Sequence, residues 1–270
     1  MKKVIVMNGI DKGEAFSRGD ISSTFVKGMA VLKAFDDTKP RLTLSEIAEI
    51  TQLDRAAVRR LALTLVHLGY VGKSGRHFSL TPRILVLAGG FLRNNGFGTH
   101  IQPILNRFSE RLGSAISLAM LDGSEAVYVA QSTLHNSAVS FGFTVGSRIP
   151  VLHTSIGRML LAYGDPDKAG TLVREVPLTA YTNATVCDRD AIRGRIDEAR
   201  TRGFVIVDGE FEAGVTGFSV PVGPIGQLKA VLGASEPYSV VADEDTRARF
   251  IDILQQCAVE LDRSKILGAD

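Results

Sequence analysis

The order of helix and turn signals between residues 43 and 80 restricts the fold more than any other feature of the chain. Thr43 and Glu46 have the spacing of a capping box, which predicts a short helix over the residues that follow. After a tight connection, Asp54 is placed to cap a longer helix, which Gly69 ends. Two helices joined by so short a turn predict a helix-turn-helix.

The longer helix has one apolar face and one basic face. Val58, Leu61, Leu65 and Leu68 recur at helical spacing and are expected to pack on the preceding helices. The opposite face carries arginines and a small alanine. This face suits the major groove of DNA, because arginine can bind guanine bidentately and alanine lets the backbone approach. The alternative is an exposed helix with solvated arginines; the capped helix before it and the basic hairpin after it favour DNA binding.

Residues 70–80 contain two short strand-like stretches around a basic, glycine-rich tip, which predicts the hairpin known as a wing. Side chains on the wing and on both helices are expected to contact phosphates or base edges. The predicted DNA-binding residues are Thr43, Ser45, Arg55, Ala56, Arg59, Arg60, Thr64, Lys73, Arg76 and His77. A single module binds weakly, so we expect a symmetric homodimer on a pseudo-palindromic site in double-stranded DNA.

Charge is distributed unevenly along the chain. Residues 1–98 contain 15 Lys and Arg against 8 Asp and Glu, whereas residues 99–270 contain 16 against 21. A basic first part and an acidic second part agree with a chain whose first domain alone meets a polyanion.

The second part of the chain predicts a larger domain of a different kind. Its strand-like stretches pair around hairpins, and its helices are not interleaved as βαβ units. This pattern favours an α+β fold with a mostly antiparallel sheet over a Rossmann sheet. The expected organisation is a flexible tail over residues 1–20, a winged helix-turn-helix over 21–81, a linker helix over 82–98 and the larger domain over 99–270.

Several classes of protein are disfavoured by what the sequence lacks. No apolar run approaches the roughly 18 residues that a membrane span needs. Cys187 and Cys257 have no metal-ligand spacing and favour a reduced, cytoplasmic compartment. There is no nucleophile elbow, His-Glu-x-x-His or Walker loop, and residues 217–221 only half resemble a nucleophile site. We therefore expect a protein without catalytic activity, cofactor or metal; a hydrolase is the alternative.

Stretches from about Phe25 to Leu261 resemble the IclR family of bacterial regulators. The matching segments are residues 25–35, 42–48, 53–60, 64–70, 145–150, 154–162, 208–210 and 219–222, with Gly214. The resemblance implies a GAF-like effector-binding and oligomerisation domain after the linker helix. It also implies homodimers that pair into a dimer of dimers.

Within this family, residues 54–70 resemble the PcaR- and PobR-like regulators of aromatic-acid catabolism. That resemblance implies a sequence-specific DNA-binding regulator, often an activator, which responds to a small carboxylic acid. Candidate effectors are 4-hydroxybenzoate, protocatechuate or an intermediate of the β-ketoadipate pathway. One alternative is an IclR-type repressor that responds to a non-aromatic metabolite such as glyoxylate or a sugar acid. Another is a DNA-binding protein without a ligand, which fits a large acidic second domain poorly.

The resemblance places the effector in a cup between the sheet and the loops of the second domain. Thr154 and Ser155 begin a helix whose free amides can hold a carboxylate, and Arg148 or His153 is expected to neutralise it. The region of Gly233 belongs to the same wall. The full set of predicted effector-binding residues is Met120, Tyr128, Arg148, His153, Thr154, Ser155, Asp208, Glu210, Gly217, Phe218 and Ser235.

Three positions depart from the family pattern. Gln52 stands where the helix-turn-helix turn usually has glycine, which predicts a slightly different turn geometry. Gly209 replaces an acidic or amide residue, and Phe218 makes one wall of the cup bulkier.

Overall fold

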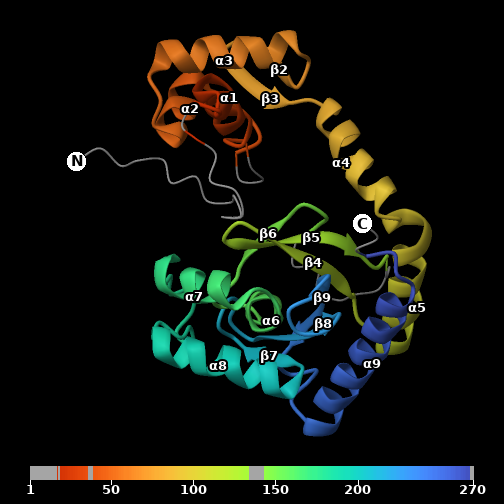
Figure 1. Ribbon diagram of the computed structural model, residues 1–270. Helices are drawn as coiled ribbons and strands as arrows, with labels where there is room; N and C mark the ends of the chain where they lie inside the picture. Colours follow the sequence, from red (N-terminus) through yellow and green to blue (C-terminus); the bar gives the residue numbers. More distant parts are fainter. Residues whose placement is uncertain (1–16, 18, 36–38, 134–142, 268–270) are drawn as a thin grey trace. The chain divides into compact units, whose positions relative to one another are not determined.

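The computed structural model divides into two compact units between Arg93 and Asn94 (Figure 1). The predicted flexible tail over residues 1–20 lies almost entirely outside the described part of the chain. The structure describes residues 17, 19–35, 39–133 and 143–267.

The N-terminal unit is a helix-turn-helix with a small antiparallel sheet in the order β1-β3-β2. The predicted wing is confirmed as the β2–β3 hairpin, in which Ser74 pairs with His77 across a two-residue turn. A long helix, α4, follows the wing. The elements are α1 (Ser23–Leu32), β1 (Leu42–Thr43), α2 (Leu44–Thr51), α3 (Arg55–His67), β2 (Val71–Ser74), β3 (His77–Leu80) and α4 (Arg83–Asn94).

The predicted helix caps are confirmed. The backbone N–H of Thr43 donates to Glu46 Oε2 at 2.8 Å, and the Glu46 N–H donates to Thr43 Oγ1 at 3.4 Å, which closes the capping box. Asp54 Oδ1 accepts from the Ala57 N–H at 2.8 Å at the start of α3. Gln52, between the two helices, adopts the left-handed conformation with φ 55°. The turn therefore keeps the backbone geometry that favours glycine, although glutamine occupies it.

Helix α3 packs on α1 and α2 through its predicted apolar face, with one exception. Val58 and Leu65 are buried, as is Ala62 between them. Leu68 is 47 % exposed, because α3 ends at His67 and Leu68 is its C-cap residue. The core of this unit is completed by Val31, Leu42, Ile47, Val71 and Phe78.

The C-terminal unit is built on a six-stranded antiparallel sheet in the order β6-β5-β4-β9-β8-β7, which confirms the predicted α+β class. Helix α9 packs on one face of this sheet, with α5 beside it, and α6 packs on the other face (Figure 1). The bounds are η1 (Phe97–Ile101), α5 (Gln102–Leu112), β4 (Ser117–Asp122), β5 (Glu125–Gln131), β6 (Arg148–Pro150), α6 (Ser155–Tyr163), α7 (Pro166–Glu175), α8 (Arg189–Arg202), β7 (Val205–Asp208), β8 (Val215–Val222), β9 (Ala230–Pro237) and α9 (Glu244–Arg263).

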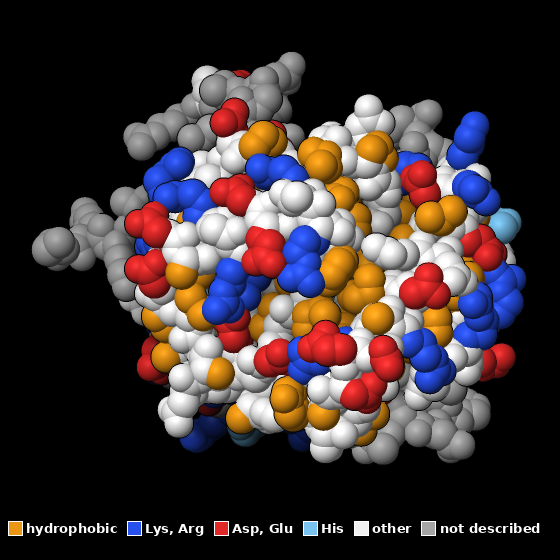
Figure 2. Space-filling view, turned by 90° about the horizontal axis from the view of Figure 1, so that it is seen from below, with side chains coloured by type: hydrophobic (Ala, Val, Ile, Leu, Met, Phe, Trp, Pro, Cys, Tyr) orange, Lys and Arg blue, Asp and Glu red, His pale blue; other side chains and the backbone are white. Residues whose placement is uncertain are grey.

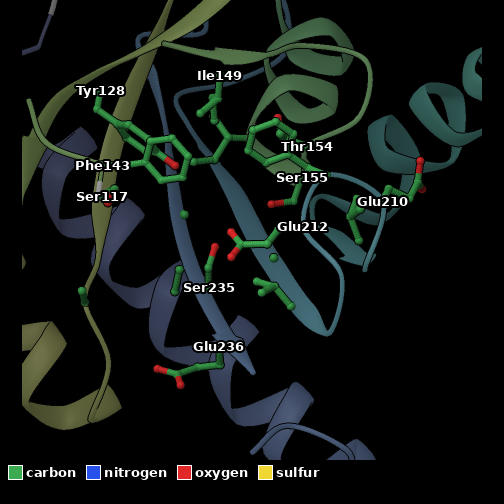
Figure 3. Close-up of a pocket in the computed structure, with 18 of the residues that line it drawn as sticks. Ser117, Tyr128, Phe143, Ile149, Thr154, Ser155, Glu210, Glu212, Ser235 and Glu236 are labelled. Carbon is green, nitrogen blue, oxygen red and sulfur yellow. The ribbon is translucent and has the colours of Figure 1, made fainter. Parts of the chain in front are cut away.

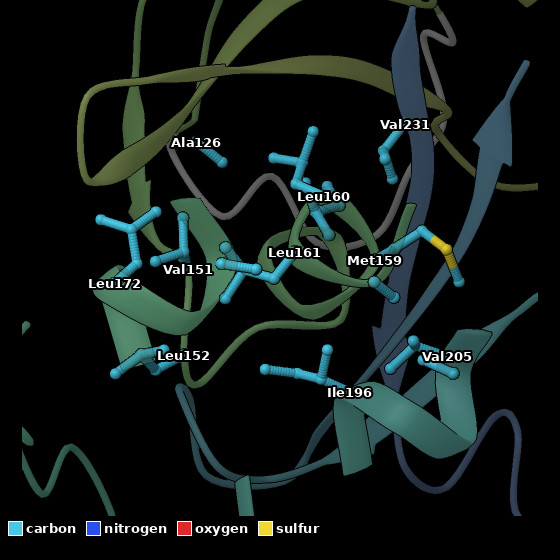
Figure 4. Close-up of a cluster of buried hydrophobic side chains, with 14 of the residues drawn as sticks. Ala126, Val151, Leu152, Met159, Leu160, Leu161, Leu172, Ile196, Val205 and Val231 are labelled. Carbon is cyan, nitrogen blue, oxygen red and sulfur yellow. The ribbon is translucent and has the colours of Figure 1, made fainter. Parts of the chain in front are cut away.

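Helix α6 is the centre of the larger hydrophobic core. It is buried from Ser155 to Ala162, because the sheet covers one side and α7 and α8 cover the other. Met159, Leu160 and Leu161 fill the space between these layers (Figure 4). On the opposite face of the sheet, α9 buries a row of apolar residues. These residues are Phe250, Ile251, Leu254, Ala258 and Leu261.

The surface seen in Figure 2 carries acidic and basic side chains intermixed, with hydrophobic side chains between them. Within the described ranges, no helix combines the length and the apolar character that crossing a membrane requires.

Candidate nucleic-acid interface and ligand cavity

The basic face of α3 is open to solvent. Arg55, Ala56, Arg59 and Arg60 are exposed, while Val58 between them is fully buried. In the described part of the chain, none of the three arginines takes part in a salt bridge or a side-chain hydrogen bond. Three adjacent cations without a protein partner, held on a helix that is packed from behind, can meet phosphates or base edges.

The other predicted DNA-binding residues differ in exposure and in whether their side chains are hydrogen-bonded within the protein. Ser45, Lys73, Arg76 and His77 are exposed, and the last three belong to the wing. Thr43 is only half-exposed, and its hydroxyl donates to Glu46 Oε2 at 2.8 Å. The Thr64 hydroxyl likewise donates to the Arg60 carbonyl at 2.9 Å. Both threonines therefore have hydroxyl protons that are already engaged within their own helices.

The C-terminal unit contains a cavity of about 120 Å³ between the sheet and the N-terminus of α6. Seven of the eleven residues predicted to bind an effector line it: Tyr128, His153, Thr154, Ser155, Glu210, Gly217 and Ser235. Figure 3 shows Tyr128 and Phe143 on one side of this space, with Thr154 and Ser155 across from them.

The N-terminus of α6 supplies the polar end of the cavity. Thr154 is its N-cap and accepts from the Gly157 N–H at 3.0 Å. The backbone amides of Ser155 and Ile156 have no acceptor among the described residues. Gly217 on β8 leaves room here, since a Cβ atom would lie 2.9 Å from Ser155 Oγ. Free amides at a helix N-terminus, beside a hydroxyl, make a site suited to an anion.

Three aromatic rings line the cavity in a row, and Tyr181 continues this row outside the lining. The ring centroids of Tyr128 and Phe143 are 5.9 Å apart, those of Phe143 and Phe211 6.2 Å, and those of Phe211 and Tyr181 5.0 Å. Burial raises the pKa of Tyr128 to about 12, so its hydroxyl stays protonated at neutral pH. The row provides apolar area and tilted ring contacts of the kind that a planar ring prefers.

Glu210 belongs to the lining, but its carboxylate is occupied by the protein. Arg158 donates from Nη1 to Oε1 at 2.7 Å and from Nη2 to Oε2 at 2.6 Å. Arg195 donates to Oε1 as well, and the Val186 N–H donates to Oε2 at 3.2 Å. Figure 3 shows this carboxylate turned away from the cavity. Glu210 therefore fastens the wall, and its acceptor sites are not available to a ligand.

Four predicted effector-binding residues lie outside the cavity lining. Each is the neighbour of a strand position that faces α6, and successive strand positions point to opposite faces. Phe218 follows Gly217 and packs on Phe250 of α9, with ring centroids 4.9 Å apart. Asp208 follows Val207 and binds Arg247 of α9 at 3.0 Å.

Met120 and Arg148 also lie outside the cavity lining because each is one strand position away from a residue that faces α6. Met120 pairs with Val127, whereas Ala119, one residue earlier, pairs with Tyr128. Arg148 is exposed and forms salt bridges with Glu125 and Asp122 on the neighbouring hairpin, while Ile149 lines the cavity.

The residues that sequence reasoning missed are spread over every strand of the sheet, the start of α6 and the loops beside β4, β6 and β7. A β-bulge in the β4–β5 pair explains one omission. In a regular strand Tyr128 and Gln131 would face opposite sides, but the bulge brings both to the cavity. The lining residues that were not predicted are Ser114, Ala115, Ser117, Gln131, Phe143, Ile149, Ile156, Val207, Phe211, Glu212, Val215, Ala234 and Glu236. The alternation around Gly217 and Tyr128 could have identified Val207, Val215 and Ser117.

The cavity offers no arginine or lysine among its described lining residues. Nor does the described part of the chain bring three His, Cys, Asp or Glu side chains into a group that could hold a metal ion. Any anion in this cavity must therefore be held by amides, hydroxyls and the imidazole of His153.

Comparison with known proteins agrees with this arrangement. The chain is 33 % identical over 263 residues to the Pca regulon regulatory protein of Pseudomonas putida, covering 97 % of this chain and 90 % of the relative. It is 31 % identical over 207 residues to the p-hydroxybenzoate hydroxylase transcriptional activator of Acinetobacter baylyi, covering 75 % and 76 %. The crystal structure of an IclR homolog from Microbacterium hydrocarbonoxydans, complexed with 4-hydroxybenzoate, matches with a TM-score of 0.72 at 27 % identity, covering 89 % and 98 %.

Two family models account for both units. The IclR helix-turn-helix domain matches residues 24–75, and the C-terminal domain of the bacterial transcriptional regulator IclR matches residues 91–263. With a helix-turn-helix and a cavity on a separate antiparallel sheet, both matched by these models, this chain belongs to the IclR family of bacterial transcriptional regulators.

Proposed function

We propose that this regulator controls genes of aromatic-acid catabolism and responds to a small aromatic carboxylate bound in the cavity. The observation that carries the proposal is the juxtaposition of free amides at the N-terminus of α6 with a row of aromatic rings. A carboxylate fits the amides, and a planar ring fits the row. Glyoxylate or a sugar acid would use the first feature and leave the second without a role.

The relatives support the same class of effector. One is named a regulator of the Pca regulon and another an activator for p-hydroxybenzoate hydroxylase, and one family structure holds 4-hydroxybenzoate. We take 4-hydroxybenzoate and protocatechuate as the leading candidates. By its likeness to the named activator, we infer that the output is activation.

Thermal unfolding tests this proposal directly. At a ligand concentration of about 100 times Kd, binding stabilises the folded state by about 2.7 kcal/mol. For a domain of this size, that corresponds to a rise in Tm of about 5–10 °C. The control is Gly217→Val, which fills the space beside Ser155 and should remove the rise. A rise with glyoxylate or a sugar acid, and none with either aromatic acid, would favour the non-aromatic alternative.

We further propose that α3 enters the major groove of a pseudo-palindromic operator and that two copies bind it together. Helix α4 supports the second part, because Leu85, Val86 and Leu87 are 58–70 % exposed on it. Apolar side chains this exposed on one helix are typical of a surface that another copy covers. Pairing of such dimers into tetramers remains part of the proposal.

Sedimentation tests the dimer. Leu85→Lys together with Leu87→Lys should shift the protein toward monomer and weaken operator binding, while 4-hydroxybenzoate affinity stays unchanged. Val240→Lys is a control of the same kind, since Val240 is also more than half exposed, at 54 %, and lies in the other unit. A dimer that tolerates both α4 substitutions would refute this assignment.

A further inference from the structure

His153 is a buried polar side chain for which the described residues provide no hydrogen-bond partner. It is 1 % exposed, and neither Nδ1 nor Nε2 has a partner among the described residues. Its ring makes an edge-on contact with Tyr181, with centroids 5.5 Å apart. Buried polar groups are almost always satisfied, so an imidazole at a cavity wall whose nitrogens have no partner in the described part of the chain is suited to a polar group bound there.

The place of His153 in the chain defines what that ligand group is. It directly precedes Thr154, the N-cap of α6, and both residues line the cavity. One polar group in this part of the cavity can therefore meet the imidazole and the free amides of Ser155 and Ile156. The amides are hydrogen-bond donors at the positive end of the helix dipole, so they favour a negatively charged group that only accepts hydrogen bonds. A carboxylate is such a group.

We propose that His153 binds the acid group of the effector together with the first amides of α6, and that its ring takes up a proton from solvent as the effector binds. The proposal rests on the proposed function, because it needs a carboxylate effector. It selects His153 over Arg148, which lies outside the cavity lining, and it adds a proton that enters with the ligand.

The surroundings keep the free imidazole uncharged. Burial lowers the pKa of His153 below its ordinary value, as does the Arg158 guanidinium, while the Glu210 carboxylate acts in the opposite direction. These two groups form an ion pair with each other, in which Arg158 Nη2 donates to Glu210 Oε2 at 2.6 Å and Arg158 Nη1 donates to Glu210 Oε1 at 2.7 Å. Tyr181 is the other titratable neighbour, and Glu212 lies elsewhere on the cavity wall. The free protein therefore presents a neutral ring near pH 7.

A bound carboxylate reverses this balance, because an opposite charge in contact favours the protonated imidazole and raises its pKa. Affinity is then greatest at low pH, provided that the acid remains ionised. The affinity falls as pH rises from the pKa of His153 in the free protein to its pKa in the complex. Over that range, binding consumes protons.

Calorimetric titration of the full chain with 4-hydroxybenzoate measures this proton. At about pH 7, the apparent binding enthalpies in phosphate and in Tris should differ, because the two buffers release their protons with different heats. The difference should correspond to uptake approaching one proton per site. His153→Gln should abolish the difference and weaken binding about tenfold or more, and His153→Asn should do the same. His100→Gln is the matched control in the same unit, where His100 is exposed and outside the cavity lining.

The outcomes separate this inference from the proposed function. Binding with equal enthalpies in both buffers would overturn the proton uptake while leaving an aromatic-acid effector in place, as would uptake that persists in His153→Gln. A Kd that is flat with pH in the unaltered protein would do the same, and this measurement does not depend on whether a variant folds. Failure of both 4-hydroxybenzoate and protocatechuate to bind would overturn the effector class and the inference together.

Discussion

Replacing Glu210 with alanine should destabilise the C-terminal unit more than almost any other single change that leaves its apolar core intact. The side chain of Arg158 is only 2 % exposed and directs two hydrogen bonds to this carboxylate. Arg195 is 46 % exposed and can turn to solvent when the carboxylate is removed. Arg158 cannot, so the substitution leaves a buried charge without its counter-ion.

The magnitude follows from that difference in exposure. Removing one partner of a buried ion pair costs about 3–5 kcal/mol. For a domain of this size the loss corresponds to about 6–20 °C in Tm. The matched control is Glu125→Ala, which removes one of the two carboxylate partners of Arg148 at the surface. Both members of that pair are nearly half-exposed, and an exposed pair contributes about 0–1 kcal/mol.

Urea unfolding of the two variants, followed by circular dichroism, measures both losses. A double variant, Arg158→Met with Glu210→Leu, removes both charges and fills a similar volume. It should be more stable than Glu210→Ala, because no unpaired charge remains buried. A loss of less than about 1 kcal/mol for Glu210→Ala, or a double variant that is less stable than the single one, would refute the reasoning.

Three further predictions concern other parts of the chain. Arg59→Ala and Arg60→Ala should each weaken operator binding while 4-hydroxybenzoate affinity stays unchanged. Where the arginine contacts a phosphate, each substitution should also reduce by about 1 the slope of log K for operator binding against log salt concentration. Binding isotherms at several salt concentrations measure this slope. An equal loss of operator and 4-hydroxybenzoate affinity would mean misfolding instead. Gln52→Gly should raise the free energy of unfolding of the N-terminal unit by about 1 kcal/mol, because it relieves the left-handed backbone at φ 55°; unchanged thermal stability would contradict this. Gly157→Ala should destabilise the C-terminal unit by about 3 kcal/mol, since its Cβ would lie 2.3 Å from the Val151 Cα, and full stability in urea would show that α6 can shift.

The N-terminal unit was largely predictable because its signals are local. The caps formed by Thr43 and Asp54, the apolar spacing along α3 and the glycine-rich wing each act within a few residues. Local signals survive without knowledge of the tertiary fold. Leu68 shows the limit of this reasoning, since a shift of one position at the helix end separates a core residue from an exposed one.

The cavity was predictable only in part, because its walls depend on strand phase and pairing. Asp208 lies in β7 and Phe218 in β8, each one residue away from a position that faces α6. A slip of one residue changes the face of every side chain in a strand. The bulge that brings Gln131 to the cavity, and the long-range pairing of Arg158 with Glu210, leave no local trace in the sequence.

The cavity has two kinds of wall, because the Glu210 carboxylate on one side is hydrogen-bonded to other parts of the protein. On one side, Arg158, Arg195 and Val186 tie that carboxylate to the fold, so substitution there alters stability and binding together. On the other side, Ser117 and Tyr128 project from the sheet, and within the described structure their side chains make no hydrogen bonds. Changes in that wall cost mainly local packing. Effector preference can therefore diverge, in nature or by design, through the strand wall without endangering the scaffold.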